Sequence, residues 1–165
     1  MQKSLIELPE MRLVGITART NNKTEADKMK GKIWPCVQRY FHQQLFDQIQ
    51  NRKKPGITIC AYTEYESDYT GDYTYFIGEE VTSHTDIPEG FDKLLIPAQN
   101  YAKFTTGPDA MPDVLIKAWN QIWTMTPKDF GGKRNYHTDF ELYDERAQDH
   151  QKVVLDIFIG LCSDH

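Results

Sequence analysis

The sequence predicts an α+β fold built from two copies of a strand-helix-strand-strand module. The same order of elements occurs twice in the 165 residues, with the pseudo-repeats covering about residues 1–90 and 91–165. The letters match as well, because the segments 62–66 and 140–144 both read as aromatic, two residues, tyrosine and acid, and a strand ending in Ile-Gly follows each. Repetition of one unit predicts two modules whose sheets join, with both helices on one side. We expect a cleft on the other side, where the modules meet.

The first module begins with a predicted strand at residues 11–20, which is rich in β-branched residues and alternates in its second half. Gly15 within this strand indicates a bulge or the close approach of another backbone. Apolar residues then recur at three- and four-residue spacing, which predicts an amphipathic helix over residues 32–51. Two further strands are expected at residues 57–66 and 73–80, separated by a turn.

The second module repeats this order after a connecting strand at residues 91–97. A strand is expected at residues 99–106, and helical spacing of apolar residues predicts a helix over residues 111–124. A strand that contains Phe140 and Glu141 and a last strand at residues 152–160 complete the module.

Composition and charge restrict the function classes. With 39% hydrophobic and 26% charged residues, the chain has the composition of a globular protein, and its 12% aromatic residues favour a stacking site. The net charge of −5 argues against direct nucleic-acid contact, which needs clustered Lys and Arg. The N-terminus lacks a long apolar run, so we expect neither a signal peptide nor a membrane span. We therefore expect the protein to be cytoplasmic. Cys36, Cys60 and Cys162 are expected to be buried free thiols, since they lack metal-ligand spacing.

The strand within residues 135–146 raises the main functional question. A period of two places Phe140 and Leu142 on one face, and Asp139, Glu141 and Tyr143 on the other. If Glu141 faces water, it is an ordinary polar position. If it faces a cavity among aromatic rings, it is a fixed negative charge suited to a cation. The spacing leaves both possibilities open.

Several segments together resemble a known family. They are Val14-Gly15-Ile16, Tyr65-Glu66 followed by Gly71, Tyr73 and Ile77-Gly78, Ile96-Pro97-Ala98 before Tyr101-Ala102-Lys103-Phe104, Trp119 with Ile122-Trp123, and Asp139-Phe140-Glu141-Leu142-Tyr143. In this order the chain resembles the GyrI-like effector-binding domain, a small-molecule module of some AraC-type and MerR-type multidrug regulators that also occurs alone. It is most similar to the standalone, integron-associated binders of cationic drugs.

The resemblance implies one curved antiparallel sheet, two main helices and a pocket between the modules for lipophilic cations. It places the central acid of the family on Glu141. The ligand-binding aromatic residues that it suggests are Tyr143, Tyr65, Tyr101, Trp119 and Trp123. Trp119 and Trp123 are four residues apart on a helix, a spacing that is also typical of core packing. Neither a cofactor nor a metal is implied.

Two other function classes remain open at this stage. Some relatives hydrolyse electrophilic drugs, and Glu141 beside Tyr143 or Tyr65 could orient a water molecule as a general base. However, Ser, Cys and His residues, His165 among them, form no nucleophile constellation in the sequence. The chain could instead act as a gyrase-inhibitor-like module that docks on a protein partner, or could form a homodimer.

Overall fold

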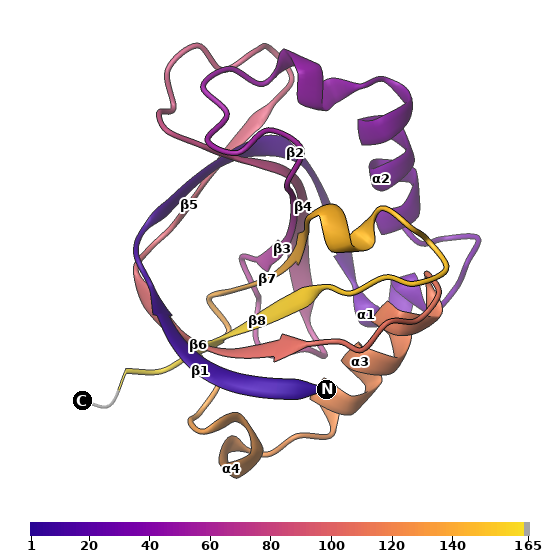
Figure 1. The fold of residues 1–165 in the computed structure, drawn as a ribbon, viewed down its shortest axis with the longest axis vertical. Helices are drawn as coiled ribbons and strands as arrows, with labels where there is room; N and C mark the ends of the chain where they lie inside the picture. The colour runs from indigo at the N-terminus through magenta and orange to yellow at the C-terminus, as the bar shows by residue number, and fades with distance from the viewer. Residues whose placement is uncertain (164–165) are drawn as a thin grey trace.

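The structure is a computed structural model that describes residues 1–163, so His165 lies outside the described residues. It contains one eight-stranded antiparallel sheet in the order β1-β6-β8-β7-β3-β4-β2-β5. The sheet curves strongly, and the two main helices lie on its outer side (Figure 1). The strands are β1 (Gln2–Leu8), β2 (Met11–Asn21), β3 (Thr58–Thr63), β4 (Asp72–Val81), β5 (Asp92–Ile96), β6 (Gln99–Thr105), β7 (Thr138–Tyr143) and β8 (Asp156–Leu161).

Within residues 1–163, two main helices and four short helical turns accompany the sheet. The main ones are α2 (Ile33–His42) and α3 (Asp113–Trp123), one in each module. Short turns of helix occur at α1 (Asn22–Glu25), α4 (Pro127–Phe130), η1 (Leu45–Gln48) and η2 (Glu145–Ala147). The predicted fold class, two like modules in one curved antiparallel sheet with two main helices, is confirmed.

The strand order is symmetric about the β7–β3 pair, where the two modules join. β1, which precedes the first module, pairs with β6 of the second, and β5 pairs with β2 of the first. The strand that precedes each module thus forms the outer edge of the other module's part of the sheet. The sequence did not predict β1, because most of its side chains are exposed and only Ile6 and Leu8 pack partly against the core, which makes its apolar pattern short.

The two faces of the sheet have different cores. On the face without helices, Phe140 packs in a cluster with Phe76, Tyr101 and Phe158. On the opposite face, one cluster lies under α2 and another under α3. Tyr62 and Tyr143 contact both of these clusters, so they lie on the helix side where the modules join.

Gly15 lies where two backbones come close together, as its position in the sequence predicted. It pairs with Gly78 across β2 and β4. A Cβ atom on Gly15 would collide with the carbonyl oxygen of Ile77, and one on Gly78 would collide with that of Val14. Only glycine fits at both positions of this pair without a shift of the backbone.

Four sequence predictions need correction. The helix expected over residues 32–51 ends at His42, because Gln44 adopts a left-handed conformation (φ 50°) and a 3₁₀ turn follows. The apolar spacing continued past this break because Leu45 and Ile49 are still buried. The strand expected at residues 57–66 ends at Thr63, the strand expected at 152–160 begins only at Asp156, and Cys162 is exposed.

The register of the sheet also corrects the alignment of the two modules. Tyr62 and Glu141 each pair with the residue two positions before the Ile-Gly dipeptide of the strand that follows. Glu141 therefore corresponds to Tyr62, whereas the letter match had placed it opposite Thr63. The letters misled because they aligned two aromatic residues, Tyr62 and Phe140, that lie on opposite faces of the sheet.

Candidate ligand-binding site

The Glu141 side chain is enclosed at the junction of the two modules and only 1% exposed. Its Oε2 atom accepts hydrogen bonds from the Tyr62 hydroxyl at 2.6 Å and from the Trp119 indole N–H at 2.7 Å. Its Oε1 atom accepts one from the Tyr143 hydroxyl at 2.7 Å. Three aromatic side chains thus surround one carboxylate, with both oxygens hydrogen-bonded.

Three elements bring these groups together. Glu141 and Tyr143 project from the same face of β7, since they are two residues apart on a strand. Tyr62 reaches across from the neighbouring strand β3, and Trp119 reaches down from α3. The carboxylate therefore lies on the helix side of the sheet. The expectation that the cleft lies on the side away from the helices is wrong for this group, because that side is filled by Phe140 and its neighbours.

The ionic environment distinguishes Glu141 from the other buried acids. Within residues 1–163, four carboxylates are buried: Glu79, Asp139, Glu141 and Asp156. The other three each form an ion pair, with Arg52, with Arg134, and with Arg146 and Lys103 respectively. None of the ion pairs among the described residues includes Glu141, whose partners are neutral donors. A buried carboxylate without a cation is costly, and this cost needs an explanation.

Burial raises the pKa values of Glu141 and of the two tyrosines that donate hydrogen bonds to it. Loss of solvent raises the pKa of Glu141 above its usual 4.5, although the hydrogen bonds from Tyr62, Tyr143 and Trp119 act in the opposite direction. Burial and the adjacent carboxylate raise the pKa of Tyr62 and of Tyr143 well above 10. Both tyrosines therefore stay protonated and remain hydrogen-bond donors at neutral pH.

The structure brings some of the predicted site residues together and leaves others apart. Trp119 and Tyr143 contact Glu141 directly. Trp123 is 37% exposed, and its ring lies 6.4 Å from that of Trp119. Tyr65 donates a hydrogen bond to Asp139 instead of Glu141. Tyr101 must be removed from this site, because it is buried on the opposite face against Phe140.

Two features of the site were missed in the sequence. Tyr62, which makes the shortest hydrogen bond to Glu141, was part of the repeat but was not a predicted ligand residue. Correct alignment of the modules would have found it, since it occupies the position equivalent to Glu141. The second feature is the pairing of Asp139 with Arg134, which lies in a loop before β7 and has no periodicity that would reveal its direction.

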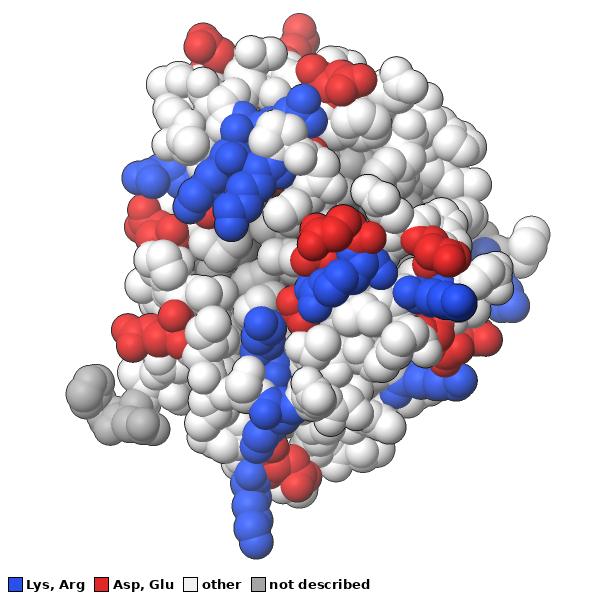
Figure 2. All heavy atoms as spheres, in the orientation of Figure 1, with Lys and Arg blue, Asp and Glu red and all other residues white. Residues whose placement is uncertain are grey.

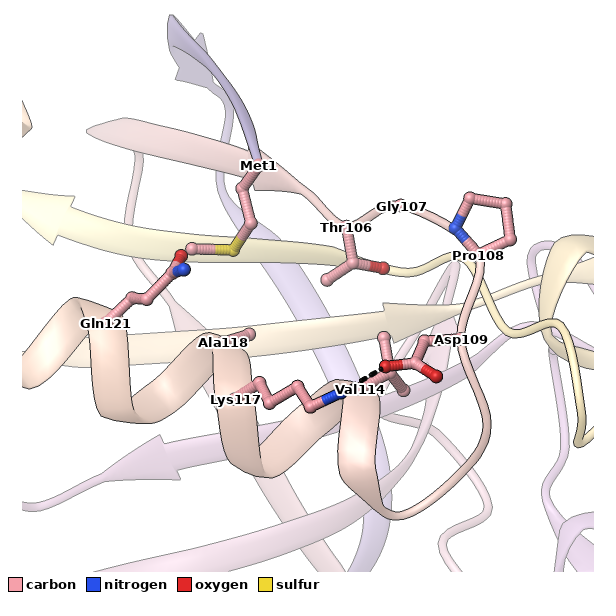
Figure 3. Close-up of a pocket in the computed structure, with 9 residues that line it drawn as sticks. All are labelled: Met1, Thr106, Gly107, Pro108, Asp109, Val114, Lys117, Ala118 and Gln121. Carbon is pink, nitrogen blue, oxygen red and sulfur yellow. Dashed lines mark hydrogen bonds and ion pairs between the residues drawn. The ribbon is translucent and has the colours of Figure 1, made fainter.

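Two open pockets lie away from Glu141. The first has a volume of about 210 Å³ and is bordered by the Asp109–Lys117 ion pair, by Thr106 and by the α3 residues Val114, Ala118 and Gln121 (Figure 3). The second, of about 430 Å³, shares Met1 and Gln121 with the first. The helix period places the α3 residues of the first pocket on a side that Trp119 does not face. These pockets are therefore separate from the carboxylate site.

The surface seen in Figure 2 carries interspersed charges. Lys and Arg side chains lie among Asp and Glu side chains across this face, without one sign covering it. Within residues 1–163 there is no helix with the length and apolar character needed to cross a membrane.

Similar proteins include curated sequences and solved structures. Residues 4–161 match the model of the family described as "Cass2: Integron-associated effector binding protein". YobU of Bacillus subtilis (strain 168) is 25% identical over 150 residues, with 91% of each chain covered. The transcriptional regulator BrlR of Pseudomonas aeruginosa is 26% identical over 151 residues, which cover 88% of this chain but only 49% of BrlR.

The integron cassette protein VCH_CASS2 from the mobile metagenome of Vibrio cholerae has a similar structure, with a TM-score of 0.75 and 27% identity over 97% of this chain and 95% of that one. SAV2435, solved bound to tetraphenylphosphonium, has the same fold, with a TM-score of 0.78 and 20% identity over 99% of this chain and 95% of that one. Since the family model matches nearly the whole chain, this protein belongs to the family of integron-associated effector binding proteins, whose fold it shares.

Proposed function

We propose that this protein binds lipophilic cations at Glu141, between the two modules, and acts by sequestering or sensing them. The observation that carries the proposal is the ionic environment of Glu141. It is the buried carboxylate of residues 1–163 that is surrounded by aromatic donors and has no basic partner. A bound cation would supply the missing charge.

The arrangement suits a cation with an apolar body. At 4 Å and an effective dielectric constant of 20, a carboxylate attracts a cation by about 4 kcal/mol before desolvation is subtracted. Each aromatic ring that faces the cation adds about 0.5–2 kcal/mol. Burial of the apolar parts of the ligand adds roughly 25 cal/mol per Å². The rings therefore accept many ligand shapes, while the carboxylate selects the sign of the charge.

A ligand can reach the carboxylate only if a ring moves. Trp119 is 8% exposed and covers Glu141 from the α3 side. Trp123 and Ile116, one turn away on the same side of α3, are much more exposed. We expect the Trp119 ring to swing outward, which would free the carboxylate and let the exposed apolar side chains of α3 contact the ligand.

The comparisons support this proposal at the level of the family. The family is described as effector binding, and SAV2435, which shares the fold, was solved with the lipophilic cation tetraphenylphosphonium. BrlR is a transcriptional regulator of about twice the matched length. From the net charge of −5 we expect no direct contact between residues 1–165 and DNA.

Paired ligands of opposite charge test the proposal. Tetraphenylphosphonium and tetraphenylborate have nearly the same size and shape, but one is a cation and the other an anion. We expect the cation to bind and to raise the melting temperature with increasing concentration, and the anion to do neither. Isothermal titration calorimetry and thermal unfolding give the two readouts.

Equal binding of both ions would contradict the proposal, because it would show that apolar burial alone drives association. Mass spectrometry of reactive electrophilic drugs after incubation with the protein measures turnover. This separate measurement addresses the alternative that the site hydrolyses its ligands.

A further inference from the structure

A second buried carboxylate lies beside Glu141 and already holds a cation. Asp139 is two residues earlier on β7 and faces the same side. Its Oδ2 atom accepts hydrogen bonds from the Tyr65 hydroxyl at 2.6 Å and from Arg134 Nη2 at 2.6 Å. Its Oδ1 atom accepts one from the Gly160 backbone N–H at 2.8 Å. Asp139, like Glu141, is thus a buried carboxylate that accepts a hydrogen bond from a tyrosine hydroxyl.

The guanidinium of Arg134 is held as a bound cation would be. Its side chain is only 6% exposed, and its charged carbon lies 4.2 Å from the centre of the Tyr136 ring. Its Nε atom is buried and has no hydrogen-bond partner among residues 1–163. The guanidinium therefore contacts one carboxylate and one aromatic face, the same two elements that we propose for a ligand at Glu141.

Aromatic rings connect the two carboxylates. The Tyr65 and Tyr73 rings lie 5.9 Å apart, and the Tyr73 and Tyr62 rings lie 5.6 Å apart. Two residues along a strand span roughly 6.7 Å. The two acids are therefore close enough for a single flat ligand to reach both, if both were free.

We propose that Arg134 acts as a tethered cation that restricts the ligand at Glu141 to a single positive charge. This inference rests on the proposed function. With Arg134 paired to Asp139, the two acids and the guanidinium carry a net charge of −1, which a monocation neutralises. A dication would leave one positive charge uncompensated in a poorly solvated site, beside the charge of Arg134.

Two ligands with a similar ring framework test the inference. Methyl viologen is a flat dication, and 1-methyl-4-phenylpyridinium is the corresponding monocation. The quantity to measure is the ratio of their dissociation constants at pH 8, obtained by calorimetry for each variant. Comparing ratios within one variant cancels differences in the stability or openness of the site.

Arg134→Gln leaves both carboxylates without an internal cation. We expect the ratio to shift in favour of the dication by about tenfold or more, since the net charge of the site becomes −2. The double variant Arg134→Gln/Asp139→Asn restores a net charge of −1. We expect its ratio to return to within about threefold of the wild-type value, because only the charge balance should matter.

Asp139→Asn provides an independent readout if Arg134→Gln does not fold. It leaves the guanidinium without its carboxylate, so both cations should bind more weakly, and the dication should lose about tenfold more than the monocation. Unchanged ratios in the folded single variants would overturn the inference. Failure of the wild-type protein to bind either cation would instead overturn the proposed function, so the two failures are distinguishable.

Discussion

Glu141→Gln is expected to weaken the binding of tetraphenylphosphonium by about 100-fold, which corresponds to about 2.7 kcal/mol. The substitution keeps the size of the side chain, and the amide oxygen can still accept the hydrogen bonds from Tyr62 and Trp119. It removes the charge, and with it the attraction for the cation. The amide NH2 group takes the place of Oε1, so the Tyr143 hydroxyl has to accept a hydrogen bond there instead of donating one. Calorimetric titration of the purified variant measures this loss directly.

The same substitution should not destabilise the ligand-free protein. The wild-type carboxylate is buried without a counterion, and burial raises its pKa, so its ionised form opposes folding at neutral pH. We therefore expect the melting temperature of Glu141→Gln at pH 7.5 to equal or exceed that of the wild-type protein. Lost binding could then not be attributed to unfolding.

Tyr101→Phe is the control for this experiment. Tyr101 was a predicted site residue, but it lies on the opposite face of the sheet, so we expect wild-type affinity. A Glu141→Gln protein that binds the cation as tightly as the wild type, or a Tyr101→Phe protein that loses binding, would contradict the assignment of the site to the helix side.

Phe140→Ala should cause the largest loss of stability, about 3–5 kcal/mol, because it leaves a cavity in the core. Phe140 is fully buried and stacks on Phe158 with a centroid distance of 4.4 Å. It lies on β7 at the junction of the modules and immediately precedes Glu141, so its packing also fixes the direction in which Glu141 projects. Urea unfolding followed by circular dichroism measures the free energy change.

Phe41→Ala is the matched control, since this phenylalanine on α2 is substantially exposed. We expect it to cost less than about 1 kcal/mol, as is usual for an exposed position. If the two substitutions had similar effects, Phe140 would not be a core residue, and the face away from the helices would be available for another role.

The sequence predicted the orientation of β7 correctly because period-two alternation directly reports the two faces of a strand. Phe140 lies on one face and Glu141 on the other, as expected. The alternation could not show whether the polar face met water or other side chains, since that depends on Trp119 from a distant helix. The resemblance to effector-binding domains, and not the periodicity, indicated a buried Glu141.

Other features depended on contacts that no local pattern contains. The alignment of Tyr62 with Glu141 needed the register of β3, β4, β7 and β8, which letter similarity placed one residue out. The direction of Arg134 is set by a loop and by its pairing with Asp139. Tyr101 was assigned to the site because its segment resembled the family, although similarity of a segment does not report which face its side chains occupy.

The protonation of Glu141 links stability and binding with a definite sign. Its pKa is raised in the folded protein, so the native state holds this proton more tightly than the unfolded chain does. Its contribution to the free energy of unfolding therefore decreases as the pH rises from about 4.5 through the raised pKa. A bound cation favours the ionised form and lowers that pKa again.

The pH dependence of tetraphenylphosphonium affinity is the most direct test that Glu141 holds the cation, because this ligand has no proton of its own to lose. Calorimetric titrations between pH 4.5 and 8.5 span the usual pKa of a glutamate and the range above it. We predict that wild-type affinity rises with pH and then levels off above the pKa of Glu141, and that the affinity of Glu141→Gln does not change in this way. A wild-type affinity that stays constant over the whole range, or a variant that shows the same rise, would contradict the account.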